Sequence, residues 1–237
     1  MLIHTLFDAL AWAMAALAAL WVRRRHGAAF ARIGLTERPG YWISGLAGLG
    51  LGASAVAALN NGLAGLLPIG HSVAGALAGG ILAVEAYKAA QGIRGSTGGI
   101  LVLPLALGIA VGRFGCLAAG IEDFTYGLPT ALPWAHDFGD GVPRHPVPVY
   151  ESLAMLGFAA LFVAALERRW PIPSDTWFYL FAIWYGAQRF AWEFLKPYPL
   201  VLGPLNLYHL ICAGLIVYGL GMLAARGRQQ SGIAAGA

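Results

Sequence analysis

Two arginines stand in stretches of sequence that are otherwise apolar. Arg113 follows the apolar run 101–112, and Arg189 lies in a second apolar stretch, four residues before Glu193. Placing a guanidinium in a hydrocarbon layer costs about 3 kcal/mol on insertion scales, so each charge needs a partner or a task. A guanidinium keeps its charge and presents a planar fork of N–H donors that suits a phosphate. The two arginines therefore predict a site for an anion.

A long polar loop, residues 121–148, follows Arg113 and ends just before Glu151. Loops of this length within a compact bundle are normally functional or disordered, and its aromatic residues favour a function. Its charged and histidine side chains are Glu122, Asp123, His136, Asp137, Asp140, Arg144 and His145. We expect the two arginines to form one electropositive pocket together with His71, His145, Glu151 and Glu193. A phospholipid head group is the obvious anion for a pocket at the membrane surface.

The elements that must position these side chains are membrane-spanning helices. The chain has 237 residues, of which 59% are hydrophobic and only 11% are charged, whereas soluble domains have about 25% charged residues. Apolar runs of the length that crosses a bilayer, about 20 residues, begin near Leu2, Tyr41, Leu66, Gly98, Ser152, Asp175 and Leu207. We therefore predict an all-α integral membrane protein with seven transmembrane helices in a single domain, residues 1–237.

The distribution of basic residues predicts the orientation of these helices. Eleven of the fifteen lie on one face, which the positive-inside rule makes cytoplasmic: Arg23, Arg24, Arg25, Arg32, Arg38, Lys88, Arg94, Arg168, Arg169, Arg226 and Arg228. The N-terminus is then outside, the C-terminus is cytoplasmic, and the loop 121–148 belongs to a small extracytoplasmic region. Because this topology explains the pI of about 9.3, the basic charge does not indicate nucleic acid. The four remaining cations, Arg113, Arg144, Arg189 and Lys196, fall in or near the outer half of the membrane.

Glycines at four-residue spacing predict close contacts between helices. Gly48 and Gly52 form such a small-xxx-small face in the second helix, and Gly75 and Gly79 form another in the third. The third helix is expected to begin near Leu66, which would place His71 in its first turns. Neither of the two cysteines, Cys116 and Cys212, belongs to a metal-binding spacing, so we expect no metal.

At the residues named above the chain resembles the bacterial prolipoprotein diacylglyceryl transferases. The Gly-Arg-x-Gly signature of that family resembles residues 112–115, GRFG, and its His-Pro-x-Gln-Leu-Tyr-Glu segment resembles residues 145–151, HPVPVYE. Its Tyr-Gly-x-x-Arg-Phe-x-x-Glu-Phe run is matched by residues 185–194, YGAQRFAWEF. The histidine that the family carries at a helix start would fall on His71.

This resemblance implies a heptahelical enzyme of the bacterial inner membrane whose active site faces the outer leaflet. The enzyme would move the diacylglyceryl group of phosphatidylglycerol to a cysteine thiol of a prolipoprotein and release glycerol phosphate, without a cofactor. The implied catalytic residues are Arg113 and Arg189, which would stabilise the leaving phosphate, and the candidate bases His71 and, as second choice, His145. The implied substrate-binding residues are Gly112, Glu122, Arg144, Tyr150, Glu151, Tyr185 and Glu193.

The chain departs from the family pattern at several of these motifs. His71 is followed by Ser72 and Val73 in place of two glycines, Cys116 stands in place of an asparagine, and Pro148 stands in place of a glutamine. The changes concentrate on the side that would receive the acceptor. Two other functions are therefore considered: a related transferase that uses an anionic phospholipid with a different acceptor, and a membrane protein that binds phospholipid without catalysis.

Overall fold

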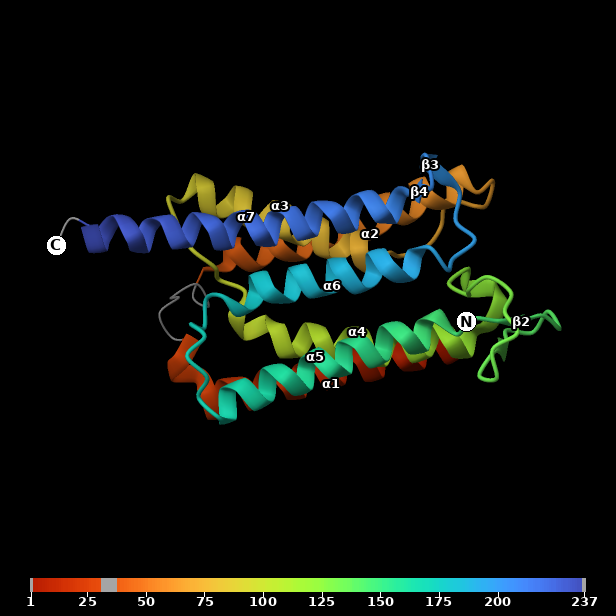
Figure 1. Ribbon diagram of the computed structural model, residues 1–237, viewed down its shortest axis with the longest axis horizontal. Coiled ribbons are helices and arrows are strands. Elements are labelled where there is room, and N and C mark those ends of the chain that lie inside the picture. Colours follow the sequence, from red (N-terminus) through yellow and green to blue (C-terminus); the bar gives the residue numbers. More distant parts are fainter. Residues whose placement is uncertain (1, 31–37, 236–237) are drawn as a thin grey trace. The chain divides into compact units, whose positions relative to one another are not determined.

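The computed structural model describes residues 2–30 and 38–235 and is almost entirely helical (Figure 1). The helices are α1 (Leu2–Phe30), α2 (Pro39–Leu63), α3 (Val73–Ala90), α4 (Val102–Ala119), α5 (Val147–Glu167), α6 (Trp177–Glu193) and α7 (Leu207–Ala235). Two short 3-10 helices, η1 (Gly99–Leu101) and η2 (Gly120–Asp123), flank α4. The predicted all-α class is confirmed. Arg32, one of the basic residues used above, lies outside the described residues.

Two small antiparallel hairpins, which the sequence did not predict, complete the structure. Strand β1 (His136–Asp137) pairs with β2 (Pro143–Arg144) inside the long loop, with His136 opposite Arg144. Strand β3 (Leu200–Leu202) pairs with β4 (Leu205–Asn206) between α6 and α7. Both hairpins lie in connections between helices, so they leave the helical architecture unchanged.

Six of the helices have the length and composition of membrane spans. Within the described residues they are Thr5–Phe30, Pro39–Leu63, Val73–Ala90, Gly99–Asp123, Val147–Glu167 and Leu207–Arg228. Helix α6 has 17 residues, so it rises about 26 Å, a little less than the hydrocarbon thickness of about 30 Å. The membrane character that the composition predicted is therefore confirmed by the lengths of the helices.

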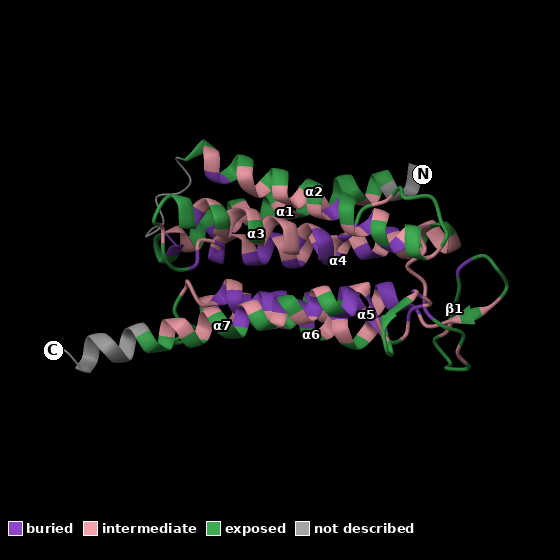
Figure 2. Cartoon of the chain, turned by 90° about the horizontal axis from the view of Figure 1, so that it is seen from above, coloured by how far each residue is buried: buried purple, intermediate pink, exposed green. Residues whose placement is uncertain are grey.

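The chain divides into two compact units. The first contains α1, η1, α4, the long loop and α5, and α4 packs against both α1 and α5. The second contains α2, α3, the hairpin β3–β4 and α7, and α3 contacts both α2 and α7. Helix α6 contributes Phe178–Gly186 to the second unit and, from Ala187 onward, residues to the first. Figure 2 shows how unevenly burial is distributed: α5 has many buried residues, whereas α1 is mostly exposed or half-buried.

The start of α3 differs from the prediction. The helix begins at Val73, seven residues later than expected, because Pro68 disfavours helical backbone at Leu67 and the chain remains irregular up to Ser72. The Ser72 hydroxyl then accepts a hydrogen bond from the Gly75 amide, at 3.0 Å, and caps the helix. The prediction that His71 belongs to the first turns of this helix is therefore wrong: His71 is an exposed residue just before the cap.

The predicted close helix contacts at the glycines of α2 and α3 are confirmed, and the structure shows that the two glycine pairs meet each other. A Cβ atom added at Gly52 would collide with the carbonyl oxygen of Gly75, and one added at Gly48 would collide with that of Gly79. The backbones of α2 and α3 therefore approach each other too closely for any side chain at these positions. Such an approach is how membrane helices gain packing energy where water supplies no hydrophobic drive.

This contact leads to a stability prediction. Changing Gly52 to alanine should lower the free energy of unfolding by about 1–3 kcal/mol, because a backbone carbonyl cannot move aside without separating α2 from α3. Changing Gly50 to alanine on the same helix is the matched control, since nothing lies within 4 Å of its Cβ position. Thermal denaturation of the two variants in detergent measures the effect. Equal melting temperatures for the two variants would contradict the close contact.

Candidate active site

The first two residues of the site come from neighbouring helices of the first unit. Arg113 lies near the end of α4, and Glu151 lies in the opening turns of α5, three residues after Pro148 in the first turn of that helix. The two helices pack together, and the Arg113 Nε atom is 2.7 Å from Glu151 Oε2. Both side chains are buried. Two residues that were expected in one pocket, Arg113 and Glu151, are therefore in direct contact.

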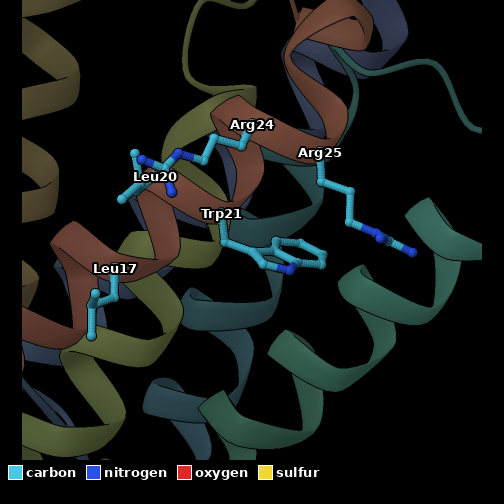
Figure 3. Close-up of a pocket in the computed structure, with 5 residues that line it drawn as sticks. All are labelled: Leu17, Leu20, Trp21, Arg24 and Arg25. Atoms are coloured by element: carbon cyan, nitrogen blue, oxygen red, sulfur yellow. The ribbon is translucent and has the colours of Figure 1, made fainter.

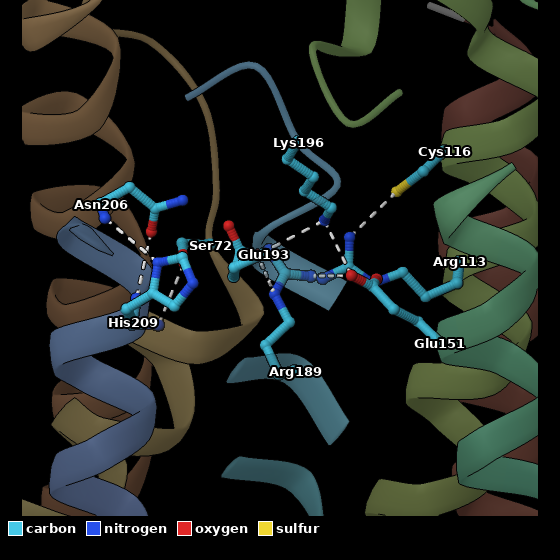
Figure 4. A network of polar contacts seen from close by, with 10 residues as sticks. Ser72, Arg113, Cys116, Glu151, Arg189, Glu193, Lys196, Asn206 and His209 are labelled. Atoms are coloured by element: carbon cyan, nitrogen blue, oxygen red, sulfur yellow. Dashed lines mark hydrogen bonds and ion pairs between the residues drawn. The ribbon is translucent and has the colours of Figure 1, made fainter. Parts of the chain in front are cut away.

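Three more residues come from the end of α6 and the turn that follows it. Arg189, Glu193 and Lys196 are spaced so that they lie on one helical face, and the Lys196 amide bonds the Glu193 carbonyl, which continues the helical turn. Arg189 Nε is 2.5 Å from Glu193 Oε1, which confirms the predicted ion pair. Arg189 Nη1 and Lys196 Nζ both contact Glu151 Oε1, at 2.6 and 2.7 Å. Figure 4 shows the three cations converging on Glu151.

We call Arg113, Glu151, Arg189, Glu193 and Lys196 the charged cluster. None of the five side chains is more than 7% exposed. Three cations face two carboxylates, so the cluster has one positive charge in excess. Burying net charge is costly, and a bound anion would lower the cost of the excess that these five side chains carry.

Arg113 also has a weak contact that a ligand could replace. Its Nη1 atom donates to the Cys116 sulfur at 3.7 Å, one turn further along α4. A thiol sulfur is a poor acceptor, so exchanging it for a phosphate oxygen would strengthen the bond to this nitrogen. The Nε atom could meanwhile keep its contact with Glu151.

The long loop is held against the segment that carries Lys196. The Leu128 amide donates to the Leu195 carbonyl at 2.7 Å, directly before Lys196. Arg144, predicted as a substrate-binding residue, pairs with Asp140 and lies over the ring of Tyr126, 4.8 Å from its centroid. These hydrogen bonds from Arg144 hold the pKa of Asp140 below its ordinary value. Arg144 thus binds within the loop, apart from the contacts of the charged cluster.

His145 and Tyr150 form a second polar group beside the cluster. The Tyr150 hydroxyl accepts a hydrogen bond from Trp134 Nε1, at 2.8 Å, and lies 3.4 Å from His145 Nδ1. Because the hydroxyl accepts from Trp134, its own proton can point toward His145. Trp134 and Tyr150 border a hollow of about 450 Å³, whose other lining residues are Leu117, Ala135, His136, Pro146, Val149 and Leu153. The hollow is mainly apolar and adjoins the helix turns that carry Arg113 and Glu151.

The remaining predicted residues are Glu122 and Gly112 in the first unit and His71 and Tyr185 in the second. Glu122 is exposed on η2, and the Cβ position of Gly112 lies 3.9 Å from Ala11 of α1, which indicates helix packing. His71 and Tyr185 belong to the second unit, where Tyr185 is buried and stacks on Phe181. No group of three or more His, Cys, Asp or Glu side chains that could hold a metal ion occurs in the part of the chain that the structure describes.

Lys196 is the cluster member that the predicted site residues did not include. The sequence marked it as one of four cations that topology does not explain, but its place after an apolar helix suggested a membrane boundary. Its spacing from Arg189 and Glu193, seven and three residues, was the signal that places it on their face. The structure adds its contacts with Glu151 and, at 3.6 Å, with Glu193.

Comparison with known proteins identifies the family. The family model for prolipoprotein diacylglyceryl transferase matches residues 41–225. Among curated relatives, the phosphatidylglycerol–prolipoprotein diacylglyceryl transferase of Methylococcus capsulatus is 33% identical over 171 residues, which are 68% of this chain and 63% of the relative. Those of Finegoldia magna and Polynucleobacter necessarius are 35% and 36% identical over 121 and 130 residues, each 51% of this chain and 47% of the relative. The aligned region thus spans about half to under two thirds of the length of these relatives.

The matched region includes every residue of the charged cluster and the long loop 121–148. The resemblance that the three motifs suggested is therefore shown over most of the chain. The chain belongs to the prolipoprotein diacylglyceryl transferase family.

Proposed function

We propose that the charged cluster binds the phosphate of phosphatidylglycerol and that the protein transfers the diacylglyceryl group to a cysteine thiol of a prolipoprotein. The observation that carries this proposal is the convergence of Arg113, Arg189 and Lys196 on the buried Glu151, in a cluster whose five side chains include three cations and two carboxylates. Phosphatidylglycerol has one phosphodiester, and hence one negative charge, so its phosphate would balance the cluster. The names of the relatives support the same donor and acceptor.

The reaction is a displacement at the glyceryl carbon that carries the phosphate. The thiol sulfur forms a bond to this carbon, the bond from carbon to the phosphate oxygen breaks, and glycerol phosphate leaves with the electron pair. Arg113 and Arg189 are placed to stabilise the charge that develops on the phosphate. Preorganised donors of this kind contribute about 3–4 kcal/mol each in a site from which water is excluded.

The thiol must lose its proton to a base, because only a few per cent of a free thiol is ionised at neutral pH. His145 is supported by its place in the first unit, beside the hydroxyl of Tyr150, which precedes Glu151. A hydrogen bond from that hydroxyl to Nδ1 would direct the lone pair of Nδ1 at the hydroxyl, so the hydroxyl oxygen would accept the thiol proton while the hydroxyl proton passes to Nδ1. His71, the first choice from sequence, stays a prediction.

The proposal includes the orientation of the protein. We place seven spans in the bacterial inner membrane with the N-terminus outside, because eleven basic residues then lie on the cytoplasmic side. The end of α4, the start of α5 and the end of α6 then lie near the outer leaflet. The charged cluster would meet phosphatidylglycerol there, and a prolipoprotein cysteine would approach from the same side.

The direct test replaces Arg113 and Arg189 singly by alanine. Each change should reduce transfer from labelled phosphatidylglycerol to a lipobox peptide by at least about 100-fold, the loss typical of removing one such donor. Lysine at the same positions keeps the charge and the fold but loses the planar fork, so it should restore only part of the activity. Arg94→Ala, in an exposed connection, is the control. Full activity in both alanine variants would contradict the mechanism.

The same assay separates the two alternatives. A different acceptor predicts that phosphatidylglycerol is consumed only when a membrane extract replaces the lipobox peptide, with lipid-modified products detectable by mass spectrometry. A protein that binds lipid without catalysis predicts tight binding of phosphatidylglycerol, lost in the Arg113 and Arg189 variants, with no turnover. The first alternative is tested because Cys116 and Pro148 replace family residues on the side that would receive the acceptor.

A further inference from the structure

A hollow on α1, separate from the charged cluster, has a lining that suits a lipid. A hollow of about 450 Å³ on the surface of the first unit is lined by Leu17, Leu20, Trp21, Arg24 and Arg25 (Figure 3). All five residues belong to the half of α1 that leads to its basic segment. None of them takes part in the chemistry proposed above.

Along the helix axis the lining residues change from apolar to aromatic to positively charged. Leu17 and Leu20 are 62% and 41% exposed, so they present apolar surface where acyl chains would contact them. Trp21 follows, and tryptophan prefers the level of the membrane interface. Arg24 comes last, and its spacing from Leu17 is two helical turns, or about 10 Å. The leucines, the indole and the guanidinium thus follow one another as acyl chain, glycerol and phosphate do in a lipid.

The two arginines that border the hollow differ in their partners. Arg25 extends toward α5, where its guanidinium contacts both carboxylate oxygens of Glu167 at 2.6 and 2.9 Å, so its charge is neutralised within the protein. Arg24 extends the other way, alongside Leu20 (Figure 3). It pairs with no acidic side chain among the residues that the structure describes. Among the described residues, the Arg24 guanidinium beside the hollow therefore has no carboxylate as a counter-charge, and an anionic lipid could supply one.

We infer that this hollow is a binding site for an anionic phospholipid. Arg24 binds the phosphate, Trp21 lies at the level of the glycerol, and the acyl chains lie along Leu17 and Leu20. The site is separate from the donor site at Arg113 and Arg189 and does not depend on the proposed reaction. In the proposed orientation it faces the cytoplasmic leaflet, so its lipid would hold the inner end of α1 at the membrane surface.

The test uses Trp21 as a local reporter. Protein is reconstituted in phosphatidylcholine vesicles that contain phosphatidylglycerol, with bromine on the acyl chains of one lipid or the other. The contribution of Trp21 to quenching is the difference between the parent protein and its Trp21→Phe variant, since the chain has eight tryptophans. Brominated phosphatidylglycerol should quench Trp21 about fivefold more per mole than brominated phosphatidylcholine, the enrichment expected from one basic residue near an anionic surface.

Arg24→Gln should remove this preference, so that the two lipids quench Trp21 equally. Arg23→Gln is the matched control: Arg23 is the neighbouring residue, carries the same charge and is also exposed, but it does not line the hollow. Arg24→Lys should keep part of the preference, which excludes a folding defect as the cause. An equal loss in the Arg23 and Arg24 variants, or no preference in the parent protein, would overturn the site. Arg113→Ala should leave the preference intact, so this test stands whether or not the transfer reaction is correct.

Discussion

Replacing Glu151 by glutamine is expected to lower the free energy of unfolding by about 3–5 kcal/mol, the typical cost of removing one partner from a buried charge network. Glu151 is the carboxylate that contacts all three cations of the charged cluster, at 2.6–2.7 Å. A neutral amide of the same size would remove one of the two carboxylates of the charged cluster, the one that contacts Arg113, Arg189 and Lys196. We therefore expect the variant to lose stability and transfer activity together.

The melting temperature in detergent measures this effect, with Glu122→Gln as a control of identical chemistry. Because Glu122 is exposed on η2, that change should alter stability by no more than about 0.5 kcal/mol. Adding lipid distinguishes a loss of stability from a loss of donor binding. If phosphatidylglycerol binds the cluster, it should raise the melting temperature of the parent protein. A Glu151→Gln protein as stable as the parent would show that the cluster does not exist as described.

The sequence predicted the parts of this structure that depend on composition and periodicity. Long apolar runs fix the number and approximate positions of the helices, and glycines at four-residue spacing fix the face of α2 that meets α3. Glu193 was an expected neighbour of Arg189 because it lies one turn later, and Glu151 was expected in the same pocket as Arg113. Each of these signals is contained in a short stretch of sequence or follows from the type of a side chain.

Of the features that sequence reasoning missed, one has a local cause and the others depend on contacts between distant segments. The delayed start of α3 follows from a local signal, Pro68, that the apolar run around it obscured. Lys196 resembled an ordinary boundary lysine until the fold brought it to Glu151, 45 residues away in the chain. The hydrogen bond from Trp134 to Tyr150 belongs to the same class, since nothing in an irregular loop specifies which aromatic residue will turn back to α5.

Replacing Lys196 by methionine should impair the use of an anionic lipid without breaking the cluster apart. The two arginines keep their carboxylate partners, but the cluster loses its excess positive charge. A hydrogen bond or contact to a charged group contributes about 1.5–3 kcal/mol, so we expect kcat/KM for phosphatidylglycerol to fall about 10- to 100-fold, mainly through a higher KM. Lys196→Arg keeps the charge and should stay within a few-fold of the parent, which separates a loss of charge from a loss of packing.

The double variant Glu151→Gln with Lys196→Met provides the sharpest test, because it removes one charge of each sign. The cluster then has two cations and one carboxylate, and its excess is again one positive charge. If net charge governs the cluster, the double variant should be more stable than Glu151→Gln alone, with a coupling energy of about 0.5–3 kcal/mol between the two positions. It should also bind phosphatidylglycerol more tightly than Lys196→Met does. Strictly additive losses in stability, together with lipid binding no better than that of Lys196→Met, would show that the geometry around Glu151 determines donor binding and that the excess charge does not.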